Sequence, residues 1–233
     1  MLLELGLMTQ HLTPTLHDVA AAAGVSTATV SRCLNFPDKV APATRERIDQ
    51  AIAQLGYTPN FGAKVMAARR THTIGAIIPT MENAIFARGL QAFQEELRLH
   101  GYTMLVATTS YDPAREAEQV RALIARGADA LLMIGYARDA AVDKLIAAQG
   151  IPALVTWAYA PDMTHPSVGF DNAAAMRAMA QAVLDEGHTT LGFITAQTDN
   201  NDRASARLDG IRDAMHVAGL DANALSVVCL LYT

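Results

Sequence analysis

The first stretch of this chain with a strong structural signal is residues 15–34, which read TLHDVAAAAGVSTATVSRCL. Thr15 and Asp18 have the spacing of a capping box, which predicts that a helix begins directly after Thr15. Gly24 breaks the alanine run, and Ser26 can cap a second helix. Two helices joined by a short turn containing glycine form a helix-turn-helix unit, whose second helix can enter the DNA major groove. A helical hairpin without a nucleic-acid role has the same spacing, so these residues alone leave both interpretations open.

A third helical pattern begins at Pro42 and ends at Gly56, so the N-terminal part of the chain is expected to fold as a small three-helix unit. Apolar residues recur at helical spacing on all three helices and should meet in one core. The expected core consists of Val19, Ala23, Val25, Val30, Leu34, Ile48, Ile52 and Leu55.

The chain has 233 residues, of which 51% are hydrophobic and 18% charged, and its formal net charge is −5. Residues 1–70 nevertheless hold seven Lys or Arg against five Asp or Glu, so a polyanion is expected to meet this part. No apolar stretch reaches the roughly 18 residues of a bilayer helix, and the first residues resemble no secretory signal, so we expect a cytoplasmic protein. Cys33 and Cys229 lie in apolar segments and are expected to be buried thiols, with no disulfide or metal role.

From residue 73 onward, strand patterns alternate with helical patterns, and a glycine follows each helical pattern. This alternation is typical of parallel sheets with right-handed crossovers, whose ligands bind beyond the carboxyl ends of the strands. The expected strands are 73–79, 103–108, 129–134, 153–157, 167–170, 190–195 and 225–229. The expected helices are 83–100, 113–126, 139–149, 172–186 and 203–218.

Several motifs together carry a resemblance to one protein family. In the N-terminal part they are Thr15 to Ala20, Ala23 to Ser26, Thr29 to Arg32, Leu34-Asn35, Thr44-Arg45, Leu55-Gly56-Tyr57 and Pro59-Asn60. In the remainder they are Ile74-Gly75, Gly127 to Leu131, Ile151-Pro152, Asp171-Asn172, Gly187-His188 and Arg207 to Gly210. With these motifs the chain resembles the lactose/galactose repressor family of bacterial transcription regulators from residue 15 to about residue 220. Tyr111-Asp112-Pro113, Glu116, Glu118 and residues 168–172 are similar to the gluconate-utilisation repressors of that family.

The resemblance implies an all-α helix-turn-helix headpiece and an α/β two-lobed domain like that of periplasmic binding proteins, with parallel sheets and an incomplete second lobe. The expected parts are an N-terminal extension (1–14), a DNA-binding domain (15–59), a hinge helix or linker (60–72) and an effector-binding domain (73–233). The chain ends earlier than members of that family, which suggests truncation, and its last apolar strand should leave apolar surface exposed. Met8 is an alternative to Met1 as the first residue.

In such a headpiece the second helix reads base edges from its first turn. Thr27 and Ala28 fall in that turn, and Arg32 lies one turn further on. Met66 corresponds to an apolar side chain with which the hinge helix wedges open the minor groove. The full set of expected DNA contacts is Ser26, Thr27, Ala28, Thr29, Ser31, Arg32, Asn35, Asn60 and Met66. For Ser26, helix capping without a phosphate contact is an equal alternative.

The resemblance also implies a small-molecule site between the two lobes of the larger domain. The residues that map to this site are Ile85, Phe86, Trp157, Asp171, Asn201, Arg203 and Arg207. An aromatic face and guanidinium groups suit a sugar or a sugar acid such as gluconate. Core packing or a surface ion pair is the alternative role for each of these side chains.

These features together predict a sequence-specific repressor of a sugar or sugar-acid operon, which binds operator DNA as a homodimer and needs no cofactor or metal. Sequence motifs of nucleophilic hydrolases, nucleotide-binding loops and zinc proteases do not occur, so no enzymatic activity is expected. Two alternatives remain: a truncated protein that no longer responds to an effector, and a sugar-binding protein without a DNA role.

Overall fold

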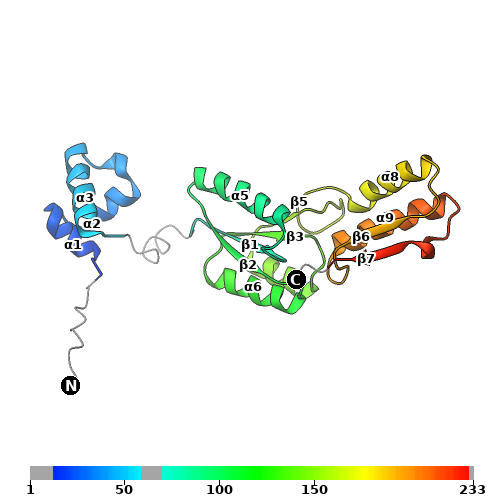
Figure 1. Ribbon diagram of the computed structural model, residues 1–233. Coiled ribbons are helices and arrows are strands. Elements are labelled where there is room, and N and C mark those ends of the chain that lie inside the picture. Colours follow the sequence, from blue (N-terminus) through cyan, green and yellow to red (C-terminus); the bar gives the residue numbers. More distant parts are fainter. Residues whose placement is uncertain (1–12, 59–69, 231–233) are drawn as a thin grey trace, which may run out of the picture. The chain divides into compact units, whose positions relative to one another are not determined.

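The computed structural model describes residues 13–58 and 70–230, which belong to two compact units (Figure 1). We call residues 13–58 the head and residues 70–230 the α/β unit. Asn60, Met66 and most of the expected hinge segment lie outside the described residues. Among the helices that the structure describes, none is long and apolar enough to cross a membrane.

The head contains the three predicted α-helices and a short 3-10 helix. They are α1 (Leu16–Ala23), α2 (Thr27–Asn35), η1 (Pro37–Lys39) and α3 (Pro42–Leu55). The predicted capping box is present, because the backbone N–H of Thr15 donates to the Asp18 carboxylate at 2.8 Å and the Thr15 hydroxyl accepts from the Asp18 N–H. Gly24 and Gly56 follow α1 and α3 with φ angles of 63° and 62°, in the left-handed region that favours glycine.

One apolar core holds the head together. Its buried members are Val19, Ala20, Ala23, Val30, Cys33, Ile48, Ala51 and Tyr57. The predicted core members Val25, Leu34 and Ile52 pack against this cluster while partly buried. The prediction for Leu55 is wrong, since this side chain is 36% exposed. The reason is local: the chain reverses at Gly56, the N–H of Tyr57 donates to the carbonyl of Ile52 at 3.1 Å, and the Tyr57 ring is the buried group at this end.

The α/β unit begins with a five-stranded parallel sheet in the order β2-β1-β3-β4-β5. The strands are β1 (Thr73–Ile78), β2 (Thr103–Thr108), β3 (Ala130–Ile134), β4 (Ala153–Thr156) and β5 (Ser167–Val168). The helices α5 (Ala84–Leu99), α6 (Pro113–Ala125) and α7 (Ala140–Gln149) connect them (Figure 1). We call these strands and helices lobe one. All its elements lie within two residues of their predicted positions.

Both faces of this sheet are covered, which explains why its strands are continuous apolar runs. Ile77 of β1 belongs to a core with Val120 of α6 and Val142 of α7. Its neighbour Ile78 points to the other face, into a core with Phe86 and other residues of α5. The central strands are therefore fixed in register, and their carboxyl ends carry the loops that form the site below.

Lobe two follows β5 and contains a two-stranded parallel sheet and two helices. Its elements are α8 (Asn172–Asp185), β6 (Gly192–Thr195), α9 (Asp202–Val217), η2 (Ala222–Ala224) and β7 (Ser226–Cys229). Helices α8 and α9 pack closely because Gly210 has no side chain, and a Cβ there would lie against the Ala173 carbonyl. A core that includes Ala180, Ile211 and Met215 fills the space between the helices and the sheet.

The small sheet of lobe two is exposed, as the apolar last strand predicts. Ile194 of β6 is 67% exposed, and Val228 of β7 is 51% exposed. Cys33 is buried as predicted, but the prediction for Cys229 is wrong, because this thiol is exposed on β7. In the described part of the chain all four residues of β7 are exposed, so Cys229 is exposed although its neighbours in the sequence are apolar.

Candidate DNA-binding face and inter-lobe cleft

The start of α2 is organised by Ser26. Its hydroxyl accepts a hydrogen bond from the backbone N–H of Thr29 at 3.2 Å and lies 2.9 Å from the Thr29 hydroxyl. The Ser26 hydroxyl therefore caps the N-terminus of α2, and the Thr29 hydroxyl is bonded to it within the first turn. This cap fixes the direction of α2 and leaves Thr27 and Ala28 exposed at its first turn.

One face of α2 is buried and the other is open to solvent. Val30 and Cys33 point into the head core, whereas Ala28 and Arg32, four residues apart, share the exposed side. Near the end of the helix, Asn35 donates through its amide to the carbonyl of Ser31 at 2.8 Å, so part of its hydrogen-bonding capacity is used inside α2. We call Thr27, Ala28 and Arg32 the exposed stripe of α2.

The chemistry of this stripe suits DNA. Helix α2 has no Asp or Glu, so no carboxylate on it repels phosphates, and its N-terminus carries the positive end of the helix dipole. A threonine hydroxyl and an alanine methyl can contact base edges, including the thymine methyl group, and arginine can bind guanine or a phosphate. The structure therefore brings Thr27, Ala28 and Arg32 to one accessible face.

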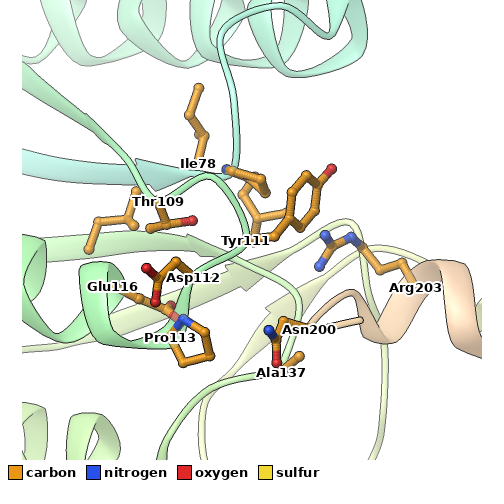
Figure 2. A pocket seen from close by; sticks show the side chains of 12 residues that line it. Ile78, Thr109, Tyr111, Asp112, Pro113, Glu116, Ala137, Asn200 and Arg203 are labelled. Atoms are coloured by element: carbon orange, nitrogen blue, oxygen red, sulfur yellow. The ribbon is translucent and has the colours of Figure 1, made fainter. Parts of the chain in front are cut away.

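In the α/β unit, a cleft lies beside the loops after β1 and β2, with the loop after β3 and the start of α9 at one end and the segments after β6 and β7 at the other. A cavity of about 260 Å³ is lined by Thr80, Glu82, Asn83, Ser110, Tyr111, Ala196, Gln197 and Leu230. A second and much smaller cavity of about 20 Å³, close to the size of one water molecule, lies beside Tyr111, Glu116 and Arg203 (Figure 2). Tyr111 lines both cavities, so it stands between them.

Tyr111 and Arg203 meet at the cleft from opposite lobes. Figure 2 shows the Arg203 side chain reaching from α9 toward the Tyr111 ring, which follows β2. Burial raises the pKa of the Tyr111 phenol, and the positive charge of Arg203 acts in the opposite direction. Arg203 is itself only 6% exposed, and burial lowers the pKa of its guanidinium. A buried arginine of this kind needs a close anion.

The anion beside Arg203 is its chain neighbour Asp202. The two side chains form an ion pair at 2.8 Å, and the other oxygen of the same carboxylate accepts the backbone N–H of Tyr136 at 2.7 Å. One turn along α9, Arg207 donates to the side-chain oxygen of Asn172 at 2.7 Å, and no ion pair of Arg207 occurs among the described residues. Burial, together with the charge of Arg203, lowers the pKa of Arg207.

A second charged group lies under the cleft in lobe one. The Arg138 side chain is only 3% exposed and lies 3.9 Å from Glu116 and 3.9 Å from Asp143, which in turn is 3.0 Å from the His165 ring. Burial raises the pKa of Glu116, and Arg138 opposes that shift. This network links α6, α7 and the segment before β5, and its Glu116 also lines the small cavity.

The other residues expected in the effector site have mainly structural places. Ile85 is 55% exposed on α5, and Phe86 is buried with its ring edge-on to Trp157 at 5.5 Å between centroids. Asp171 caps α8 through the N–H of Ala174, and Asn201 caps α9. Of the seven expected residues, Arg203 alone lines either of these two cavities.

Sequence reasoning gave no role in the cleft to Asp202, Tyr136, Asn172 or Gln197. Asp202 lies in the first turn of α9, where an acidic residue is favoured by the helix dipole alone. No local sequence pattern therefore indicates that it has a role in the cleft. Tyr111 and Glu116 belong to the motifs that carry the family resemblance, but their proximity to Arg203 depends on the packing of the two lobes.

The family of the chain follows from comparison with known proteins. Residues 15–60 match the bacterial regulatory proteins of the lacI family, and residues 71–229 match the periplasmic binding proteins and sugar binding domain of the LacI family. The chain therefore belongs to the LacI family. This confirms the resemblance and the fold class predicted from the sequence.

Among its relatives, the HTH-type transcriptional regulator GntR of Escherichia coli K12 is 31% identical over 207 residues, which are 89% of this chain and 62% of that protein. Catabolite control protein A of Staphylococcus xylosus is 28% identical over 78% of this chain and 56% of its own length. The crystal structure of a LacI-family transcriptional regulator from Silicibacter pomeroyi has a TM-score of 0.83 at 29% identity and covers 92% of this chain and 64% of that one. The chain thus spans about three fifths of the length of these relatives.

Proposed function

We propose that this protein is a sequence-specific DNA-binding repressor of a sugar or sugar-acid operon. The head binds operator DNA, with the exposed stripe of α2 in the major groove. The α/β unit binds the effector, and the protein acts in the cytoplasm as a homodimer, without enzymatic activity. The observation that carries the proposal is the accessible, acid-free face of α2 in a fully formed helix-turn-helix head. The regulatory roles of the matched relatives support the same assignment.

The effector is proposed to bind in the larger cavity of the cleft, where Ser110, Tyr111 and Gln197 offer polar side-chain groups. Arg207 lines neither cavity, and its guanidinium is bonded to the neutral Asn172 amide. We propose that it binds the carboxylate of a hydroxyl-rich ligand that extends from the larger cavity toward α9. Gluconate is the first ligand to test, followed by neutral hexoses. Melting curves of the full chain with each compound should show stabilisation by gluconate that Arg207→Met abolishes.

The DNA-binding proposal is tested by selecting binding sites from a random duplex library with the full chain. We expect a consensus made of two related half-sites, since a dimer presents two heads. The variant Thr27→Ala should change the preferred base at one position in each half-site, whereas Gln54→Ala, at an exposed position of α3, should return the parent consensus. Recovery of no enriched sequence by the folded parent chain would contradict the proposal.

A further inference from the structure

The start of α9 contacts lobe one through Asp202 and lies close to it through Arg203. Asp202 belongs to lobe two, yet its carboxylate accepts the backbone N–H of Tyr136, which follows β3 of lobe one. Arg203, held by Asp202 at 2.8 Å, extends toward the Tyr111 ring after β2, and both residues line the same small cavity. Two consecutive residues of one helix thus approach two separate loops of the other lobe. Figure 2 shows the Arg203 side chain of α9 on the same side of the small cavity as Tyr111.

We propose that Asp202 and Arg203 form a latch that holds the two lobes together through contacts of the chain itself. Asp202 is the central group, because its carboxylate joins the Tyr136 N–H and the Arg203 guanidinium. Hydrogen bonds to a charged acceptor at 2.7 to 2.8 Å are short and strong, and they are stronger still where burial excludes water. The contacts that carry this proposal lie within the chain, so its test does not depend on the effector or on the DNA role proposed above.

The packing around Gly135 supports the same assignment. Gly135 directly precedes Tyr136 and has a φ of 67°. A Cβ atom built there would fall on the Arg203 guanidinium and on the Asp202 carboxylate, so a side chain at this position is incompatible with the latched arrangement. The main chain of lobe one therefore approaches the ion pair of lobe two as closely as a glycine permits.

A second connection between the lobes has a different character. At the crossover between the lobes, Asn172 donates to the Trp157 carbonyl at 3.1 Å and to the Phe170 carbonyl at 3.3 Å, and Gly169 packs its main chain on Ala158. These contacts accompany the covalent connection between the lobes, which persists whether or not the cleft is closed. The latch joins segments 66 residues apart in sequence, so it can open while the crossover stays intact.

The test uses hydrogen exchange of the Tyr136 amide in the unliganded full chain, measured residue by residue by NMR. In Asp202→Ala, this amide should exchange about tenfold faster or more, the factor expected for the loss of one charge-assisted hydrogen bond. The matched control is Asp213→Asn on the same helix, which removes a 2.7 Å ion pair with Arg177 that stays inside lobe two. This control should leave the Tyr136 amide unchanged.

A second readout follows the lobes directly. Trp157, the single tryptophan, lies in lobe one, and Cys229 is exposed in lobe two while Cys33 is buried, so an acceptor dye on Cys229 reports the distance between the lobes by energy transfer. Asp202→Ala should change the transfer efficiency, and Asp213→Asn should not. Protection of the α9 amides of Ile211 and Ala214 shows whether lobe two is still folded.

If Asp202→Ala unfolds lobe two, Gly135→Ala tests the latch from lobe one, and the same changes in exchange and energy transfer are expected. Unchanged Tyr136 exchange in a folded Asp202→Ala chain would overturn the proposal. An equal acceleration in Asp213→Asn would overturn it too, since the effect would then be a general loosening of α9.

Discussion

The head and the cleft of the α/β unit are built from contacts of opposite range. In the head, the groups that shape the candidate DNA-binding face are three or four residues apart, as in the pairs Ser26 with Thr29 and Ser31 with Asn35. In the cleft, the groups that meet are 35 residues apart for Asn172 and Arg207 and 66 apart for Tyr136 and Asp202. A short-range site is encoded in a motif, whereas a long-range site exists only when distant segments of the chain are packed together.

The largest expected effect is a loss of stability in the α/β unit when a buried charge in it loses its partner. Arg138→Met leaves the buried Glu116 carboxylate without its cation, and breaking such a pair costs about 3–5 kcal/mol of unfolding free energy. Urea unfolding of the α/β unit at pH 7 should show this loss, with the head unaffected. The double variant Glu116→Gln/Arg138→Met should recover most of it.

The unfolding free energy of the single variant Arg138→Met should also depend on pH in a defined direction. Burial raises the pKa of Glu116 in the folded chain, and Arg138 lowers it, so the variant should have a still higher Glu116 pKa. A carboxyl group with a raised folded pKa stabilises the fold below its unfolded pKa, and this contribution is lost as pH rises through the folded value. The loss of unfolding free energy in Arg138→Met relative to the parent should therefore become smaller as the pH is lowered from 7 to 5. An equal deficit at both values would contradict this account.

In the head, the largest effect should come from its core. Ile48 is fully buried, and Ile48→Ala should cost about 2–5 kcal/mol, enough to unfold much of a small domain. Leu55→Ala, on the same helix but 36% exposed, should cost far less. Unfolding followed by head resonances measures both. Similar losses in the two variants would show that the assignment of the buried face of α3 is wrong.

These variants also show how far sequence reasoning reaches. The capping box, the glycine stops and the alternation of strands and helices depend on neighbours in the chain, so the elements could be predicted within two residues. The apolar character of Leu55 and Cys229 predicts that both are buried, but both are exposed. Tyr57 takes the buried place at the end of α3, and the face of β7 that carries Cys229 is open. The role of Asp202 could not be predicted, since it depends on a backbone N–H of the other lobe.

A smaller effect is expected on DNA binding by the head, without a change in the stability of the head. Arg32→Ala should weaken binding to the selected operator by about 1–3 kcal/mol without lowering the melting temperature of the head, because Arg32 is exposed. Binding measured over a range of salt concentrations distinguishes the two contacts open to Arg32. A lost phosphate contact reduces the salt slope by about one, and a lost base contact leaves it nearly unchanged. Parent affinity at every salt concentration would exclude Arg32 from the interface.

The smallest effect concerns the cap of α1. Thr15→Ala removes one side of the capping box and should cost about 1 kcal/mol of unfolding free energy, whereas Thr15→Ser should keep the parent value. Thermal unfolding of the head measures both. A loss in Thr15→Ser equal to that in Thr15→Ala would mean that the hydroxyl is not the stabilising group.

The most direct test of the central claim, that the start of α2 is the DNA-reading surface, is an NMR titration of the full chain with its selected operator duplex. The backbone amides from Ser26 to Arg32 should show the largest shift changes in the described head, and those of lobe one should stay in place. Large shifts confined to α3 or to the α/β unit, with α2 unperturbed, would contradict the claim.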